Sequence, residues 1–119
     1  MTLIDTNVLL DLVTDDPLLI NDVIYAELSV RYDSKEQLDD FISGIRLKRD
    51  PIPDAALFLA GKVFRKYRKA GGTRSGVLPD FFIGAHAAVR GLPLLTRDLG
   101  RYRSYYPTVE VIAPVKGKF

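Results

Sequence analysis

Short, mostly apolar runs alternate along this chain with longer segments of helical periodicity, and they lie at 2–4, 18–20, 94–96 and 109–112. Each run has the length of a buried strand, and most of its apolar residues are consecutive. Buried strands joined by helices are typical of a parallel sheet that carries helices on both faces. The pattern therefore predicts the α/β class with a central parallel sheet.

Capping signals divide the segments between these runs into helices. Asn21 is a good N-cap residue, Ser34 with Gln37 three residues later matches a capping box, and Asp54 can cap a third helix. We predict helices at 8–13, 22–31, 34–44, 54–69 and 80–90.

Length and composition exclude several classes of protein. A chain of 119 residues can bury one core, so we expect a single domain spanning 1–119. The chain has no cysteine and one histidine, which excludes disulfide frameworks, thiol nucleophiles and multi-histidine metal sites. Because no segment has the length of a membrane span and no basic, apolar leader opens the chain, we expect a cytoplasmic protein without membrane contact.

The net charge of +2 conceals a division between the two parts of the chain. Residues 1–45 hold ten acids and two bases, whereas residues 46–119 hold fifteen bases and five acids. Such asymmetry indicates an anionic partner for the basic part and a cation or basic partner for the acidic part. Ordinary solvated helix faces would give the same composition, and this alternative stays open.

Four carboxylates lie where a sheet of this class brings polar groups together. Asp5 and Asp98 each follow a predicted strand. Asp80 lies in the first turn of one predicted helix, and Glu27 lies within another. Ligands of parallel sheets bind beyond the carboxyl ends of the strands. Each acid alone could be a cap, a turn residue or a solvated residue, but four converging acids would require protons or a bound cation.

Carboxylate oxygens without histidine or cysteine select hard divalent ions such as Mg²⁺ or Mn²⁺ over zinc. Phosphoryl transfer is the reaction that uses such a site, because the ion activates a water and offsets charge on the phosphate oxygens. A receiver-like phosphoacceptor signalling domain is an alternative of similar size. That class needs paired acids after the first strand, whereas Thr6 follows Asp5 here.

Four ordered segments hold these acids, namely Leu3–Leu10, Val23–Leu28, Leu78–Ala87 and Leu94–Asp98. Together they resemble the motifs of PIN-domain ribonucleases, and most closely those of VapC toxins from type II toxin–antitoxin pairs. The resemblance spans nearly the whole chain, and the last two motifs with their spacing are the most specific. It implies a three-layer α/β/α sandwich around a central parallel sheet.

The resemblance also implies a site and its chemistry. The implied ligands of Mg²⁺ or Mn²⁺ are Asp5, Glu27, Asp80 and Asp98, with Asn7 and Thr96 orienting a carboxylate or a water. The implied activity is endonucleolytic cleavage of RNA by metal-activated water, which leaves a 5′-phosphate and a 3′-hydroxyl. Such toxins form homodimers and pair with a small VapB-like antitoxin that blocks the site. A PIN fold that binds RNA without turnover is the second alternative.

One departure from the family concerns the connection between the first two strands. Family members usually carry a further helical segment there, whereas only Thr14–Pro17 separates Val13 from Leu18. A right-handed crossover takes about a dozen residues, which 6–17 barely supplies. Either the protein is naturally shorter here or residues are missing between Pro17 and Leu18.

Basic residues in the second part of the chain form a candidate path for RNA. They are Arg65, Arg68, Lys69 and Arg74 around a helix end and the following loop, and Arg97 and Arg101 beside Asp98. Such cations can contact phosphates while tyrosines stack on bases, although cations at a helix end also suit the helix dipole without any ligand. His86 lies about 240° around the helix from Asp80, so we predict a structural role for it.

Overall fold

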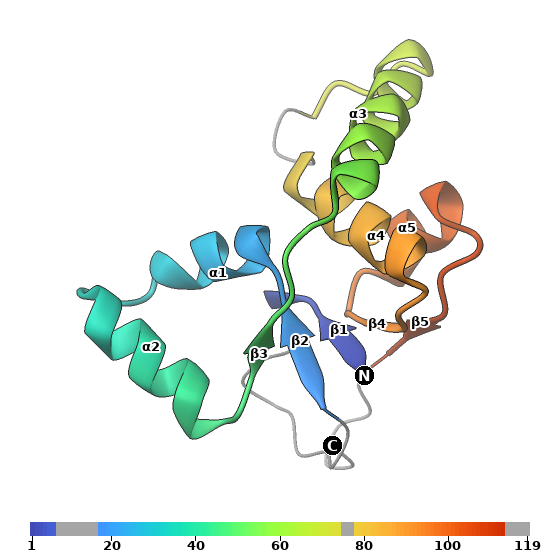
Figure 1. Cartoon of the computed structure of the whole chain (residues 1–119). Coiled ribbons are helices and arrows are strands. Elements are labelled where there is room, and N and C mark those ends of the chain that lie inside the picture. Colours follow the sequence, from blue (N-terminus) through green and yellow to red (C-terminus); the bar gives the residue numbers. More distant parts are fainter. Residues whose placement is uncertain (7–16, 75–77, 114–119) are drawn as a thin grey trace.

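The computed structural model describes residues 1–6, 17–74 and 78–113, and within them the chain forms a parallel sheet surrounded by helices (Figure 1). The strands are β1 (Thr2–Ile4), β2 (Leu18–Ile20), β3 (Lys48–Arg49), β4 (Leu94–Leu95) and β5 (Val111–Ile112). Their order across the sheet is β3-β2-β1-β4-β5, and every pairing is parallel. The prediction of an α/β fold with a central parallel sheet is therefore confirmed.

The described helices lie between the strands along the chain, with α1 and α2 after β2, α3 and α4 after β3, and α5 after β4. They are α1 (Asp22–Ser29), α2 (Lys35–Gly44), α3 (Asp54–Lys69), α4 (Leu78–Arg90) and α5 (Leu99–Tyr105). In Figure 1, α1 and α2 lie to the left of the sheet, and α4 and α5 lie above it and to the right. This arrangement gives the three layers of an α/β/α sandwich. None of the helices in the described segments is long and apolar enough to cross a membrane.

The strand order creates a switch point between β1 and β4. The chain moves outward from β1 to β2 and β3, and then returns to the opposite side of β1 to form β4. Crossovers of opposite direction leave the sheet on opposite faces, so a crevice opens at the carboxyl ends of β1 and β4. The residues that follow these two strands, Asp5 and Thr96, are both buried there.

Burial of the central strands explains why the chain folds in this register. Leu3, Ile4 and Leu94 have no exposed surface, and Leu3 pairs directly with Leu94. Each such apolar side chain contributes about 1.5–3 kcal/mol when it is fully buried. The edge strand β3 consists of two exposed basic residues, which is why the apolar pattern of the sequence did not predict it.

A buried polar network holds α4 against the sheet. The Asn21 side chain accepts a hydrogen bond from the amide of Ile24, so it caps α1 as predicted, and its Nδ2 faces His86 Nδ1 at 3.1 Å. His86 Nε2 therefore carries the proton and donates to Asp50 at 2.7 Å. The histidine is fully buried and bonded to residues that follow β2 and β3, which confirms its structural role.

Close packing of α5 on α4 depends on Gly84. A methyl group at Gly84 would lie 2.4 Å from the Tyr106 ring and 3.1 Å from the Tyr102 ring. The Tyr106 hydroxyl donates to the carbonyl oxygen of Phe81 on α4 at 2.7 Å. The small residue thus lets two tyrosines of the α5 region reach the helix that carries Asp80.

Two local predictions need correction. Asp54 does not cap α3, because the N-cap is Pro53 and Asp54 is already the first helical residue. The sequence analysis predicted no helix after 80–90, whereas Leu99–Tyr105 forms the helix α5. The predicted helix at 8–13 lies outside the described residues.

Candidate functional site

Asp5 is the most buried carboxylate of the site, with 5% of its surface exposed. Its Oδ1 accepts a hydrogen bond from the amide of Thr6 at 2.8 Å. Its Oδ2 accepts from the hydroxyl of Thr96 at 2.9 Å and from that of Tyr102 at 3.3 Å. Burial raises the pKa of Asp5, and these three donors act against that shift because they stabilise the ionised form.

Thr96 connects the ends of the two central strands. Its buried hydroxyl donates to Asp5 and accepts a hydrogen bond from the amide of Asp98 at 3.0 Å. The hydroxyl hydrogen is thus used in the bond to Asp5, and the hydroxyl oxygen accepts from the backbone that leads into α5. Thr96 therefore fixes the orientation of one carboxylate and the backbone position of another.

Glu27 joins the site from α1. Its Oε1 accepts a hydrogen bond from the Thr6 hydroxyl at 2.9 Å, so Thr6 bonds to both Asp5 and Glu27. Burial raises the pKa of Glu27, the Thr6 hydroxyl lowers it, and the charges of Asp5 and Asp80 raise it further. The like-charge contributions indicate that α1, β1 and α4 bring these three carboxylates near one another.

Asp80 and Asp98 share a cation, Arg101 of α5. Its Nη1 donates to Asp80 Oδ2 and also lies 3.1 Å from Asp98 Oδ2. Burial raises the pKa of Asp80, Arg101 lowers it, and the charges of Asp5 and Asp98 raise it. The structure therefore brings all four predicted acids to the carboxyl edge of the sheet, together with one guanidinium.

The chemistry of this donor set fits a hard divalent ion. Its candidate ligand atoms are carboxylate oxygens. Neighbouring negative charges help to raise the pKa values of Asp5, Glu27 and Asp80, and a bound cation would relieve that repulsion. Within residues 1–6, 17–74 and 78–113, however, no three acidic or histidine side chains are gathered closely enough to hold one ion as they stand. Arg101 occupies the position between Asp80 and Asp98.

The other predicted site residues are distributed as follows. Asn7 lies outside the described residues. Arg65, Arg68 and Lys69 lie on exposed turns of α3, and Arg68 also lies 5.8 Å from the centre of the Phe64 ring. The amide of Arg74 donates to the Tyr67 hydroxyl at 3.1 Å, which holds the loop after α3 against that helix. Their contact with RNA stays a prediction.

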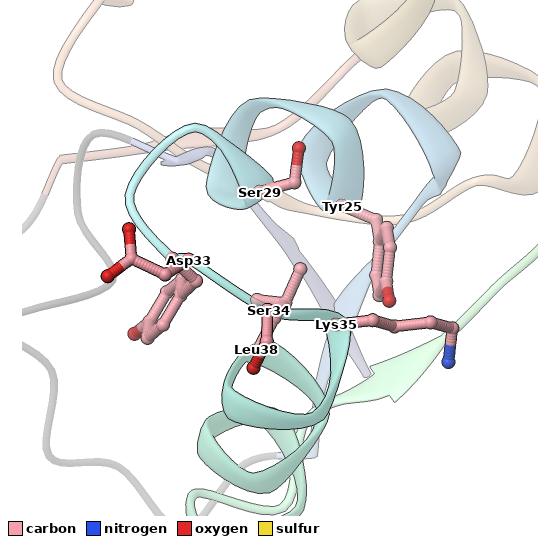
Figure 2. A pocket seen from close by; sticks show the side chains of 7 residues that line it. Tyr25, Ser29, Asp33, Ser34, Lys35 and Leu38 are labelled. Atoms are coloured by element: carbon pink, nitrogen blue, oxygen red, sulfur yellow. The ribbon is translucent and has the colours of Figure 1, made fainter.

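A separate hollow lies between α1 and α2 (Figure 2). It has a volume of about 250 Å³ and is lined by Tyr25, Ser29, Tyr32, Asp33, Ser34, Lys35 and Leu38. Figure 2 shows Tyr25 and Lys35 at one end of this hollow and Asp33 at the other. None of the four acids at the carboxyl edge lines it, so it is distinct from the acidic site.

Solved structures show the same fold. A chain of VapBC2 from Rickettsia felis, crystallised with a DNA fragment from its promoter, superposes with a TM-score of 0.71 at 18% identity, over 96% of this chain and 98% of that one. VapBC from Salmonella typhimurium gives 0.69 at 20% identity, over 95% and 98%. VapBC-5 from Mycobacterium tuberculosis, a member of the VapBC family of toxin–antitoxin systems, gives 0.66 at 21% identity, over 95% and 98%.

The chain has the fold of VapBC toxin–antitoxin proteins. The resemblance that the four sequence motifs carry is thus confirmed at the level of the fold, as is the PIN-like sandwich. No family model and no curated protein matches the sequence itself. At identities of 18–21% these superpositions establish the fold alone.

Two residues that contact these acids were missed by the sequence analysis. Thr6 bridges Asp5 and Glu27, and its position directly after a strand-end aspartate was the available signal. Tyr102 donates to Asp5 from α5, and it lies one helical turn after Asp98. That spacing could have been recognised only if α5 had been predicted as a helix. Burial and the three surrounding acids raise the pKa of Tyr102, so its hydroxyl remains a donor.

The raised pKa of Glu27 predicts how Glu27→Gln changes stability with pH. A carboxyl whose folded pKa exceeds its ordinary value of 4.5 stabilises the fold below that value, and this stabilisation is lost as the pH rises through the folded pKa. Glutamine imitates the protonated form and keeps an acceptor for Thr6. In urea unfolding with EDTA, we expect Glu27→Gln to match wild type near pH 4 and to be more stable at pH 7.

Glu36→Gln supplies the control, because Glu36 lies exposed on α2 and the substitution changes the net charge equally. A variant at Glu27 that loses more stability at pH 7 than at pH 4 would show that its carboxylate is a stabilising partner and not a crowded acid.

Proposed function

We propose that this protein is a metal-dependent endoribonuclease and the toxin of a type II toxin–antitoxin pair. The observation that carries the proposal is the buried Asp5 carboxylate at the switch point, with Glu27, Asp80 and Asp98 around it. The VapBC fold supports the toxin assignment, since the structures that share it are toxin–antitoxin complexes.

In this proposal Asp5, Glu27, Asp80 and Asp98 hold Mg²⁺ or Mn²⁺. When bound, such an ion offsets the charge that develops on the scissile phosphate and makes a water nucleophilic. Thr96 and Tyr102 hold the Asp5 carboxylate in one orientation. Asn7 remains a proposed member of the site through the sequence motif alone. The Asp5 oxygens, held by these donors, need not reorient during the reaction.

The proposed RNA path follows cations that flank the acids. Arg65, Arg68, Lys69 and Arg74 would contact phosphates from the α3 side, and Arg97 from the α5 side. Tyr67 supports the α3 side, because its hydroxyl holds the amide of Arg74. Arg101 can join the path only when its guanidinium leaves Asp80 and Asp98.

The strand order disfavours the signalling alternative. Receiver domains have the order 2-1-3-4-5, in which the first strand lies between the second and the third. Here β1 lies between β2 and β4, and β3 is at the edge. A PIN fold that binds RNA without turnover has the same topology, and the assay below separates it from a nuclease.

We further propose a VapB-like antitoxin as partner, a homodimer as the assembled toxin and the cytoplasm as its location. The support for the partner is that the compared structures are complexes of toxin with antitoxin. The acidic site offers such a partner a place for a basic side chain, since bidentate pairing of arginine with carboxylates is favourable.

The nuclease assignment predicts cleavage of single-stranded or looped RNA that requires Mg²⁺ or Mn²⁺ and stops with EDTA. Asp98→Asn should lower the cleavage rate by at least about 100-fold, because it removes one charge from the group that binds the ion. Cleavage is measured on labelled RNA by gel electrophoresis, with Asp33→Asn as control, since Asp33 is exposed and lines the separate hollow between α1 and α2.

Undiminished cleavage in EDTA by the purified protein would contradict the metal chemistry. RNA binding without any cleavage in Mg²⁺ or Mn²⁺ would favour the non-catalytic alternative.

The toxin assignment predicts growth arrest when the chain is expressed alone in bacteria. Expression of Glu27→Gln should leave growth unchanged, because the variant folds but lacks a ligand carboxylate. Growth curves after induction test this, with immunoblots to show equal protein levels. Normal growth in the presence of a wild-type protein that cleaves RNA after purification would contradict the toxin role and leave the nuclease role intact.

A further inference from the structure

The guanidinium of Arg101 lies inside the acidic site and not on its rim. A single nitrogen, Nη1, contacts one carboxylate oxygen of Asp80 and one of Asp98. About 20% of the Arg101 side chain is exposed, against 40% for Asp98. One positive group thus lies between two carboxylates from different elements, as a bridging ion would.

The fold holds Arg101 in this position from both sides. Asp98 lies three residues before Arg101, at the N-cap of α5, so the two side chains share one helical turn. Tyr102, the next residue, is buried and donates to Asp5. Because α5 is also packed on α4 beside Gly84, the fold itself directs the Arg101 guanidinium at Asp80.

The same two carboxylates are ligands in the proposed function, on which this inference rests. Mg²⁺ binds oxygens at about 2.0–2.1 Å and accepts little distortion. When a carboxylate oxygen accepts a charge-assisted hydrogen bond from Nη1, that lone pair is not available to coordinate a metal ion. A divalent ion beside a guanidinium would also be repelled, and strongly so in a partly buried site. The two cations therefore exclude each other at Asp80 and Asp98.

We propose that Arg101 is an internal competitor of the divalent ion and must leave Asp80 and Asp98 before both can bind it. In the metal-free protein Arg101 neutralises part of the charge that Asp5, Glu27, Asp80 and Asp98 concentrate at the sheet edge. In the metal-bound protein the ion takes over that role. Metal affinity is consequently set by the fraction of molecules in which the guanidinium has left.

Competition of this kind has a measurable size. The apparent dissociation constant equals the intrinsic one divided by the competent fraction, so a guanidinium that is bound in nine molecules of ten weakens metal binding about tenfold. Arg101→Ala removes the competitor and should tighten Mn²⁺ binding by about tenfold or more. Its effect should exceed that of any other single loss of positive charge from α5.

Titration calorimetry with Mn²⁺ on the full chain tests the inference. Three proteins are compared: wild type, Arg101→Ala and Arg103→Ala. Arg103 is exposed and lies on the same helix, two residues after Arg101. Its substitution removes an equal charge but leaves the contacts of Arg101 with Asp80 and Asp98 in place. We expect about tenfold tighter binding for Arg101→Ala and a change within about twofold for Arg103→Ala.

Thermal melting provides a second readout with opposite signs. Without metal, Arg101→Ala should melt below wild type, because its carboxylates lose their counter-ion. Excess Mn²⁺ should raise the melting temperature of Arg101→Ala by more than it raises that of wild type. If the alanine variant does not fold, Arg101→Gln keeps most of the side-chain packing and removes the charge.

The outcomes separate this inference from the proposed function. Equal Mn²⁺ affinities of wild type and Arg101→Ala would overturn the competition, as would equal tightening in Arg103→Ala, which would indicate net charge alone. If neither wild type nor the Arg101 variants bind Mn²⁺, the metal chemistry of the proposed function is itself wrong, and the inference falls with it.

Discussion

The burial of the Asp5 carboxylate between β1 and β4 is the constraint to which the rest of the site responds. A charged group with 5% of its surface exposed loses hydration, and the free-energy cost is reduced only if hydrogen bonds and counter-charges replace the water. Thr6, Thr96 and Tyr102 supply those hydrogen bonds. Three elements of the chain, namely the segment after β1, the segment after β4 and the helix α5, are thereby tied to one carboxylate.

Positioning of α4 depends on groups outside the acidic site. His86 is hydrogen-bonded to Asn21 and Asp50, which follow β2 and β3, so one helix is attached to the carboxyl ends of two further strands. Arg90 pairs with the same Asp50 and lowers its pKa. Asp80 lies in the first turn of α4 and His86 lies six residues later in the same helix. The hydrogen bonds that anchor His86 therefore also position Asp80.

The sequence predicted the features of this fold that depend on local pattern. Apolar runs identified four strands, and Asn21 and Ser34 cap helices as expected. It missed β3, since two exposed basic residues at a sheet edge form a strand only through pairing with β2. It missed α5 for a related reason: this short helix is stabilised by burying Tyr102 and by contacts of Arg101 and Tyr106, which lie far apart from their partners in sequence.

Residue types and spacing identified the four acids, but their spatial relationship could not be read from the chain. Arg101 illustrates this limit, because its predicted contact with phosphate stays untested, while its contacts with Asp80 and Asp98 were not predicted. The contact depends on the angle at which α5 packs on α4, which Gly84 permits. Tertiary packing thus decides whether a cation near an acidic site pairs with the carboxylates of the site or is left to contact a ligand.

Paramagnetic relaxation by Mn²⁺ tests most directly the central claim that the divalent ion binds at the switch point. In amide spectra of the ¹⁵N-labelled chain with substoichiometric Mn²⁺, the signals of Asp5, Thr96 and Asp98 should broaden first. An excess of Mg²⁺ should restore them. The acids Asp33, Glu36, Asp39 and Asp40 around the start of α2 provide an internal comparison. Broadening centred on those residues, or spread evenly over all exposed acids, would contradict the account.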